Sequence, residues 1–209
     1  MCVRAAIMLF ALAVAGCAAP APTPPVELSA ASLGDDVLAF GRIRWFENGE
    51  EKIRDMDPHY LRVDDMQSGA LAVDEAGGFT WKLPGGAYVL HQLYWRDPWS
   101  GPERLTPNVA FELPEKSSVV CLGTLVIEIA ANRYFLGALW VEDVVIHVED
   151  DCVELTSGMR AKYTDPSLTF AKSLMVFDPG MPPRPVDLEQ RDRFRDFLRS
   201  ILPGLMGTH

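Results

Sequence analysis

Hydrophobic and polar residues alternate in short runs along most of the chain from residue 37 onward. The runs are interrupted by Gly, Pro, Asp and Asn, which favour turns, and this pattern is typical of β-strands. Eight segments have it: 37–45, 60–63, 70–73, 79–83, 87–95, 109–113, 119–129 and 141–148. Their number and spacing predict a mainly β domain over residues 34–178, built as an antiparallel β-sandwich.

Two segments near the C-terminus have helical spacing instead. Asp165 favours an N-cap, and residues 166–175 after it place Leu168, Ala171 and Met175 on one side, which predicts a short helix. The segment 179–209 combines a proline-rich linker with an amphipathic helix whose apolar stripe is Leu188, Phe194, Phe197, Leu198, Ile201 and Leu202. The polar side of that helix mixes both charges, so docking on the sandwich, on a partner or on a membrane surface all stay open.

The N-terminal residues 1–16 have the layout of a secretory signal peptide. Arg4 precedes an uncharged run of 11 residues, which is too short to cross a hydrocarbon core of about 30 Å as a helix. The four residues that span the end of this segment, Val-Ala-Gly-Cys at 14–17, resemble the lipobox of bacterial lipoproteins. That resemblance implies removal of the preceding peptide, acylation of Cys17 with lipid chains such as palmitate, and membrane anchoring. The alternative is an ordinary signal peptide cut nearby, with Cys17 unmodified.

A spacer follows this cysteine. Residues 18–25 read Ala-Ala-Pro-Ala-Pro-Thr-Pro-Pro, and proline fixes φ near the polyproline value, so we expect a semi-rigid tether of about 25 Å. We assign 17–33 to the lipidated cysteine and this Pro/Ala tether. Ala18 stands where an aspartate would signal retention in the inner membrane, so the lipobox resemblance favours the outer membrane, with the domain facing the periplasm.

The charge of the chain limits the classes of partner that it can bind. The sequence has 19 Lys and Arg against 29 Asp and Glu, a net charge of −10. An acidic chain without a basic stripe is a poor ligand for nucleic acid, so we expect no nucleic-acid partner. The length of 209 residues suits one domain with short appendages.

Residues 73–90 carry a second resemblance. Asp74 begins a turn, Gly77 and Gly78 permit positive φ, Phe79 and Trp81 alternate onto one face, and residues 84–86, Pro-Gly-Gly, reverse the chain. The pattern D-x-x-G-x-F followed by L-P-x-G-x-Y resembles the hairpin of the carboxypeptidase regulatory-like, or prealbumin-like, β-sandwich. A Leu-Gly-Thr-Leu strand, as at 122–125, also occurs in bacterial lipoproteins of this type. The resemblance covers about residues 37–130 and implies a binding or structural module of unknown function without catalytic residues.

Two cysteines stay unassigned in the mature chain, Cys121 and Cys152. If strands 119–129 and 141–153 pair so that Leu125 meets Val148 and Ile127 meets Ile146, the residue numbers in each pair add up to 273, and the same register sets Cys121 opposite Cys152. Directly opposed cysteines lie within reach of a disulfide bond, which an oxidising compartment allows. The alternative is two buried thiols in a slipped register, because residues 149–151, Glu-Asp-Asp, can turn the chain before Cys152.

The sequence shows no motif for catalysis or metal binding. The histidines, His59, His91, His147 and His209, lack metal-ligand spacing, and no nucleophile elbow or nucleotide loop is present. We interpret His91 as a hydrogen-bonded, half-buried residue on the face of Leu93 and Trp95, and His147 as pointing to solvent. Residues 147–151 are interpreted as a charged hairpin end and not as a calcium loop. We therefore predict no cofactor, no metal and no catalytic residue.

One loop offers candidate binding residues. Trp95, Arg96 and Trp99 lie in or beside a Pro/Gly-containing loop at 93–108, and such side chains anchor interfaces or stack on sugars. The structural alternative is that Trp95 ends a core strand and that Trp99 folds back onto the protein and packs beneath its own loop. The leading hypothesis is a membrane-anchored periplasmic lipoprotein that binds an envelope protein or glycan without catalysis. The alternatives are an envelope hydrolase acting on peptidoglycan or polysaccharide, with carboxylates gathered by the fold, and a mechanical spacer.

Overall fold

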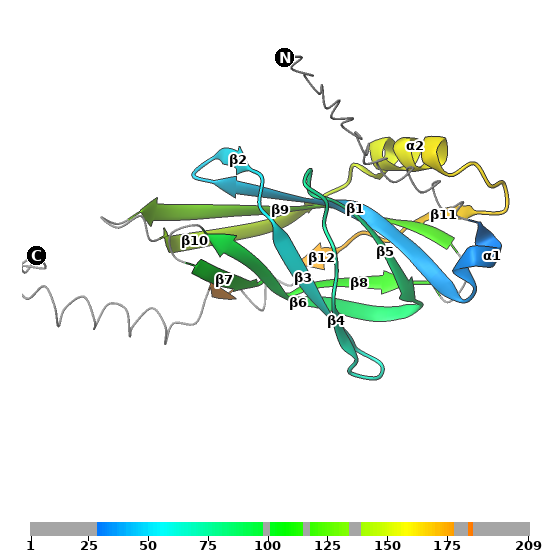
Figure 1. Cartoon of the computed structure of the whole chain (residues 1–209), viewed down its shortest axis with the longest axis horizontal. Helices are drawn as coiled ribbons and strands as arrows, with labels where there is room; N and C mark the ends of the chain where they lie inside the picture. Colours follow the sequence, from blue (N-terminus) through cyan, green and yellow to red (C-terminus); the bar gives the residue numbers. More distant parts are fainter. Residues whose placement is uncertain (1–28, 98–100, 115–117, 134–138, 178–183, 186–209) are drawn as a thin grey trace, which may run out of the picture.

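The computed structural model describes residues 29–97, 101–114, 118–133, 139–177 and 184–185. In this part of the chain two β-sheets pack against each other, which confirms the predicted mainly β sandwich (Figure 1). All eight predicted segments overlap a strand, although 60–63 meets only the end of one and 70–73 does so at Ala70 alone. The signal peptide, Cys17, the tether at 18–25, Trp99 and the C-terminal apolar stripe lie outside the described residues.

Sheet A has six described strands. Its main path runs β10 (Leu139–Glu149), β9 (Ser118–Arg133), β1 (Asp36–Glu47) and β2 (Glu50–Lys52), while β5 (Gly78–Pro84) also pairs with β1 and β11 (Thr169–Lys172) with β9. The pairs β1–β9 and β11–β9 are parallel, and the remaining pairs are antiparallel. Because β1 and β9 run in the same direction, their last residues reach the same end of the sandwich.

Sheet B has seven described strands. Its path runs β12 (Val176–Phe177), β8 (Val109–Leu113), β6 (Gly86–Asp97), β3 (Met56–Arg62) and β4 (Ser68–Ala70). Strand β7 (Gly101–Thr106) pairs with the second half of β6 and with β13 (Arg184–Pro185). All described pairs in this sheet are antiparallel.

The main core lies between the two sheets. Strand β5 shows the expected alternation, because Phe79, Trp81 and Leu83 are buried while Thr80 and Lys82 are exposed. From sheet B, Tyr88 and Phe111 stack in the same core with ring centroids 5.2 Å apart. Burial of these faces from water is the main driving force for the sandwich.

The segment 73–90 forms its turns as predicted but is not a hairpin. Asp74 accepts hydrogen bonds from the amides of Ala76 and Gly78, and of the two glycines only Gly77 takes a positive φ, of 80°. After the reversal at Gly86, β6 enters sheet B while β5 stays in sheet A, so the turn links the two sheets. The Tyr88 hydroxyl donates to the Pro84 carbonyl across this link at 2.7 Å, and burial raises the pKa of Tyr88 to about 12.

A bulge in β9 explains the disulfide bond. The β1–β9 register shifts between Phe40 and Arg42, and Gly123 has a φ of 77°, so residues before and after it face opposite sides. The prediction that Cys121 and Leu125 share a face is therefore wrong: Leu125 enters the main core, and Cys121 enters a second cluster on the outer face of sheet A. Any residue with a side chain would be strained at position 123, because its backbone φ is positive and an added Cβ would lie 2.6 Å from the Glu149 carbonyl oxygen.

The predicted bridge between Cys121 and Cys152 is confirmed, with Cα atoms 5.7 Å apart. The predicted register is also confirmed where it pairs Leu125 with Val148 and Ile127 with Ile146. The ladder ends at Glu149, however, and Cys152 begins helix α2 (Cys152–Lys162). The chain turns before Cys152, as the alternative supposed, and the helix still brings the cysteine to its partner.

The helical predictions need correction. The proposed helix at 166–175 is wrong, because residues 165–168 form a turn in which Asp165 accepts from the amide of Ser167, and β11 follows. Parallel pairing with the buried N-terminal half of β9 outweighs the weak helical spacing. Two helices were missed, α2 and the short α1 (Ala30–Leu33), which lies inside the segment assigned to the tether. Both have contacts with sheet A (Figure 1).

Candidate functional site

One end of the sandwich gathers four charged side chains from segments far apart in the sequence. Strands β1 and β6 both finish with tryptophan, one intervening residue and an acid: Trp45 to Glu47 and Trp95 to Asp97. Alternation puts each tryptophan and its acid on the inner face. The two indole rings meet in the core with centroids 4.7 Å apart, which brings the two acids together at the end of the strands.

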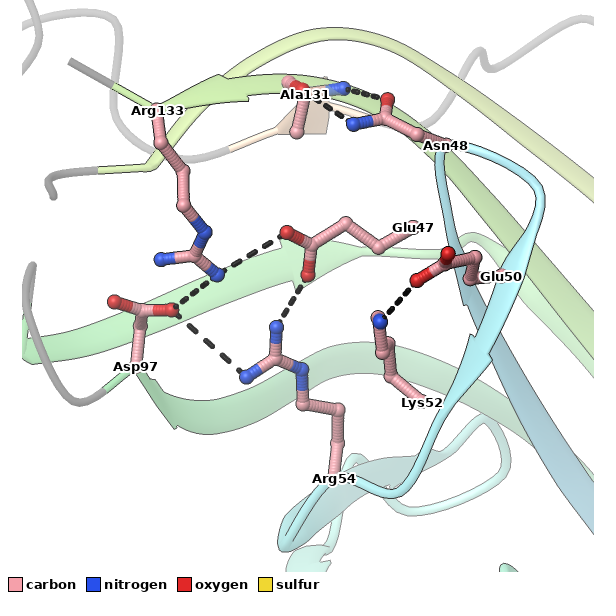
Figure 2. A network of polar contacts seen from close by, with 8 residues as sticks. All are labelled: Glu47, Asn48, Glu50, Lys52, Arg54, Asp97, Ala131 and Arg133. Atoms are coloured by element: carbon pink, nitrogen blue, oxygen red, sulfur yellow. Dashed lines mark hydrogen bonds and ion pairs between the residues drawn. The ribbon is translucent and has the colours of Figure 1, made fainter.

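Arg54 and Arg133 complete this group, which we name the quartet (Figure 2). Arg54 comes from the link between β2 and β3, and Arg133 is the last residue of β9. Glu47 accepts from the Arg54 guanidinium and, at 3.1 Å, from Arg133 Nη2. Asp97 Oδ2 lies 3.3 Å from Arg133 Nη2 and 3.8 Å from Arg54 Nη1. Each acid therefore contacts both guanidinium groups, and the four formal charges cancel.

The quartet is buried unevenly. The side chain of Asp97 is 0% exposed and that of Arg133 is 39% exposed. Burial acts to lower the pKa of Arg133, but the hydrogen bonds and negative charges of Asp97 and Glu47 outweigh it and raise that pKa above its usual value. The mutual attraction of paired buried charges offsets the desolvation penalty that leaves an isolated buried charge strongly unfavourable. The quartet thus has a closed inner side, formed by Asp97, and an accessible outer side, formed by Arg133.

The turn beside the quartet is fastened to the same strand. Asn48 and Gly49 form the β1–β2 turn with φ of 53° and 81°. The Asn48 amide group accepts from the Ala131 backbone N–H at 2.9 Å and donates to the Ala131 carbonyl at 2.7 Å. These two bonds extend the β1–β9 ladder beyond the last strand residue (Figure 2). The end of β9 that carries Arg133 is therefore held in place by the turn.

The arrangement is suited to holding strands together and poorly suited to acid–base chemistry. A general acid or base must reach the proton that it transfers. Here both Asp97 and Glu47 are directed to guanidinium N–H donors, and both are buried. In the described part of the chain, no three His, Cys, Asp or Glu side chains gather in a way that could hold a metal ion. The quartet joins β1, β6, β9 and the β2–β3 link into one rigid end.

The predicted binding residues separate in the structure. Trp95 is 5% exposed and packs on Trp45, so its ring is in the core, as the structural alternative supposed. Arg96 is exposed at the start of the β6–β7 connection. Trp99 belongs to residues 98–100, outside the described part. Of the three candidates, Arg96 is the one that the structure places on the surface.

The structure agrees with the sequence-based interpretation of His147 but not with that of His91. His147 has a side chain that is 43% exposed, with Glu149 Oε1 3.6 Å from its Nε2, so its surface position is confirmed. His91 is half-buried as expected, but its Nε2 has no hydrogen-bond partner among the described residues. It is also an extra residue in β6, because His59 pairs with Gln92 and Tyr60 with Leu90. Ala87 and Val89 consequently lie on the opposite face from Leu93 and Trp95, and the single face assumed from the sequence is wrong.

The quartet itself was missed by the sequence analysis. Two signals point to parts of it: Asn48-Gly49 is a strong hairpin signal, and the tryptophan, x, acid pattern occurs twice at strand ends. Neither signal pairs the acids with Arg54 and Arg133. Asp97 lies 36 positions from Arg133 in the sequence and Glu47 lies 86 positions from it, and partners so far apart are set by the packing of the sheets.

Comparisons with known proteins add no identification. No protein-family model matches the chain, and no curated protein matches it. Within the described residues, neither helix has the length and apolar character needed to cross a membrane.

Proposed function

We propose that this chain is a bacterial envelope lipoprotein, anchored in the outer membrane through Cys17, whose β-sandwich binds an envelope protein or glycan without catalysing a reaction. The lipobox-like residues 14–17 support the anchor. The prealbumin-like pattern of residues 73–90 supports a binding module, as does the sandwich around it.

One observation carries the non-catalytic part of the proposal, namely the pairing of Glu47 and Asp97 with Arg54 and Arg133. These are the two acids that the fold brings together at one end of the sandwich. A hydrolase built on them would have to free a carboxylate from its guanidinium partners before it could reach a substrate. As a clamp, the quartet instead supplies a rigid base for the β6–β7 connection, and rigid scaffolds that carry surface loops are common in binding proteins.

The anchor is tested by blocking lipoprotein processing. We expect globomycin treatment or a Cys17→Ala substitution to slow the protein's electrophoretic mobility, because the precursor then keeps residues 1–16. Unchanged mobility under both treatments would contradict lipidation at Cys17.

The binding role is tested by crosslinking in intact cells, followed by purification and mass spectrometry. The test variant combines Arg96→Ala with Trp99→Ala, and the matched control is Arg160→Ala, an exposed arginine on α2. We expect a specific protein or glycan fragment to be captured by the unmodified chain and the control, and to be reduced in the test variant. If purified protein instead released fragments from peptidoglycan or polysaccharide, and Glu47→Gln abolished that release, the hydrolase alternative would replace this proposal.

A further inference from the structure

The outer faces of the two sheets are covered differently. On sheet A, helix α2, Leu33 of α1 and the segments on either side of β11 pack over the strands, and their contacts form the second apolar cluster. On sheet B, no described element packs over the outer face (Figure 1). Sheet B is therefore the face whose side chains are available to a ligand.

Polar and aromatic side chains gather on one half of this outer face. Tyr94 in β6 lies directly opposite Asp57 in β3 and Arg104 in β7. One step along the strands, Gln92 lies opposite His59. The Tyr94 hydroxyl donates to Gln92 Oε1 at 2.5 Å, and its ring meets the His59 ring edge-on with centroids 4.8 Å apart. We name Asp57, His59, His91, Gln92 and Tyr94 the polar patch.

The bulge in β6 lies at the centre of the polar patch. The extra residue, His91, disrupts the local pairing and puts His91 and Gln92 beside His59. Bulges of this kind redirect side chains and are common next to functional sites. The buried Nε2 of His91 lacks a hydrogen-bond partner within the described chain, and an unsatisfied buried polar atom is destabilising.

The patch has hydrogen-bonding groups that the described protein does not use. Elsewhere on the surface, several charges are paired, as Arg44 is with Glu51 and Lys172 with Asp150. In the patch, the Asp57 carboxylate, the His59 ring nitrogens and the Gln92 amide nitrogen make no hydrogen bond to a described residue. These groups offer both donors and acceptors.

The charges of the patch favour an uncharged ligand. Asp57 and Arg104, which lie opposite Tyr94 on its two sides, have opposite formal charges, so this half of the face has no excess charge that would favour a charged ligand. Burial, and secondly the electrostatic effect of the neighbouring His59, lower the pKa of His91 and so favour its neutral form. With the facing part of β7 included, three strands spaced about 4.8 Å apart, over two residues each, give an area of about 10 Å by 7 Å. An area of this size accommodates one or two sugar rings.

The geometry points to a binding site for an uncharged glycan on the outer face of sheet B, formed by the polar patch. Sugar hydroxyls donate and accept at once, which matches Asp57, His59 and Gln92, and the apolar face of a sugar packs on an aromatic ring such as that of Tyr94. A protein partner would instead be expected on the neighbouring apolar half of the face, where Val176 is 62% exposed. This inference rests on the proposed binding role and names its ligand class and surface.

The test uses the full chain, purified in detergent and applied to an array of uncharged oligosaccharides of glucose, mannose, galactose and N-acetylglucosamine. Affinity for the strongest glycan is then measured by calorimetry. We expect Tyr94→Ala to weaken binding by at least about tenfold, which corresponds to about 1.4 kcal/mol. Gln92→Ala and His59→Ala should each weaken it by a smaller factor, and Tyr94→Phe should retain part of the affinity because it keeps the ring.

The matched control is Val176→Thr, on the apolar half of the same face, which should leave glycan affinity unchanged. Melting curves of every variant show whether it is folded. Glycan binding that is lost only in the patch variants supports the inference. Glycan binding that is insensitive to all of them overturns this surface but leaves a binding module. If no glycan binds but a protein is captured by crosslinking, only the ligand class is overturned. If no glycan binds and no partner is captured, both proposals are overturned.

Discussion

The two outer faces of this sandwich contrast in what protects them from water. On sheet A, the side chains of Leu38, Phe40 and Val119 are buried beneath α2 and neighbouring segments, and a disulfide fastens that cover to β9. On sheet B, the outward residues Asp57, Gln92 and Tyr94 are partly or fully exposed, and no described element covers them. The contrast shows that buried apolar contacts stabilise one face, while the described part of the other face presents polar side chains to solvent.

The largest expected effect comes from truncating an apolar side chain on the covered face. Phe40 is 2% exposed, so Phe40→Ala should lower the free energy of unfolding by about 3–5 kcal/mol through lost burial and a cavity. The matched change on sheet B, Leu61→Ala, removes a half-exposed side chain and should lower it by about 1 kcal/mol or less. Urea unfolding measures both. Equal losses would show that the two faces contribute alike.

Removing the disulfide should have the next largest effect. The double variant Cys121→Ala, Cys152→Ala opens a loop with a sequence separation of 31 residues. In the chain-entropy model this lowers the free energy of unfolding by about 3–4 kcal/mol. Urea unfolding of the variant, with the unmodified protein in reductant as the control, gives the value. Intact-mass analysis after alkylation without reductant should find Cys121 and Cys152 protected, and two alkylated thiols would contradict the bridge.

The quartet joins the two sheets, so removing one of its charges tests how much the ion pairs stabilise this end of the sandwich. Arg133 is 39% exposed, and solvent screening limits its contribution, so Arg133→Gln should lower the free energy of unfolding by only about 1 kcal/mol. Arg54→Gln removes the more buried partner and should have the larger effect of the two. Thermal melts at low and high salt compare them. An Arg133 variant that is less stable than the Arg54 variant would contradict the burial order.

The smallest expected effect is a pH dependence from His91 on the uncovered face. Because its pKa is lowered in the folded state, the unfolded chain takes up a proton first as the pH falls. The stability should therefore be complete above about pH 6.5 and decrease as the pH falls from there toward the folded-state pKa. Unfolding curves between pH 5 and 8, compared with a His91→Gln variant, isolate this contribution. Parallel pH profiles for the two proteins would show that His91 does not contribute.

Local pattern was sufficient for the strands but not for their faces. Alternation correctly located β5 and β8, and the residue numbering correctly paired Leu125 with Val148. The alternation was then carried unchanged through Gly123 and His91, where bulges reverse it. A bulge depends on the neighbouring strand as well as on its own residues, so a strand pattern taken alone does not reveal it.

The helices show the same limit from the opposite side. Residues 166–175 have weak helical spacing, and Thr169–Lys172 nevertheless pairs in parallel with β9. Residues 152–162 have only a short apolar stripe, Cys152, Leu155 and Met159, and they nevertheless form α2, which packs that stripe on sheet A. In both segments, contacts with sheet A outweigh small differences in local propensity.

The sequence by itself determined the β class of the domain, most of its turns and the register that pairs Leu125 with Val148 and Ile127 with Ile146, because alternation and turn chemistry act over a few residues. Only the tertiary structure decided which acids and arginines meet in the quartet, which face α2 covers and which polar groups stay available on sheet B. Those features join segments that are distant along the chain, and their geometry depends on how two twisted sheets pack around one core.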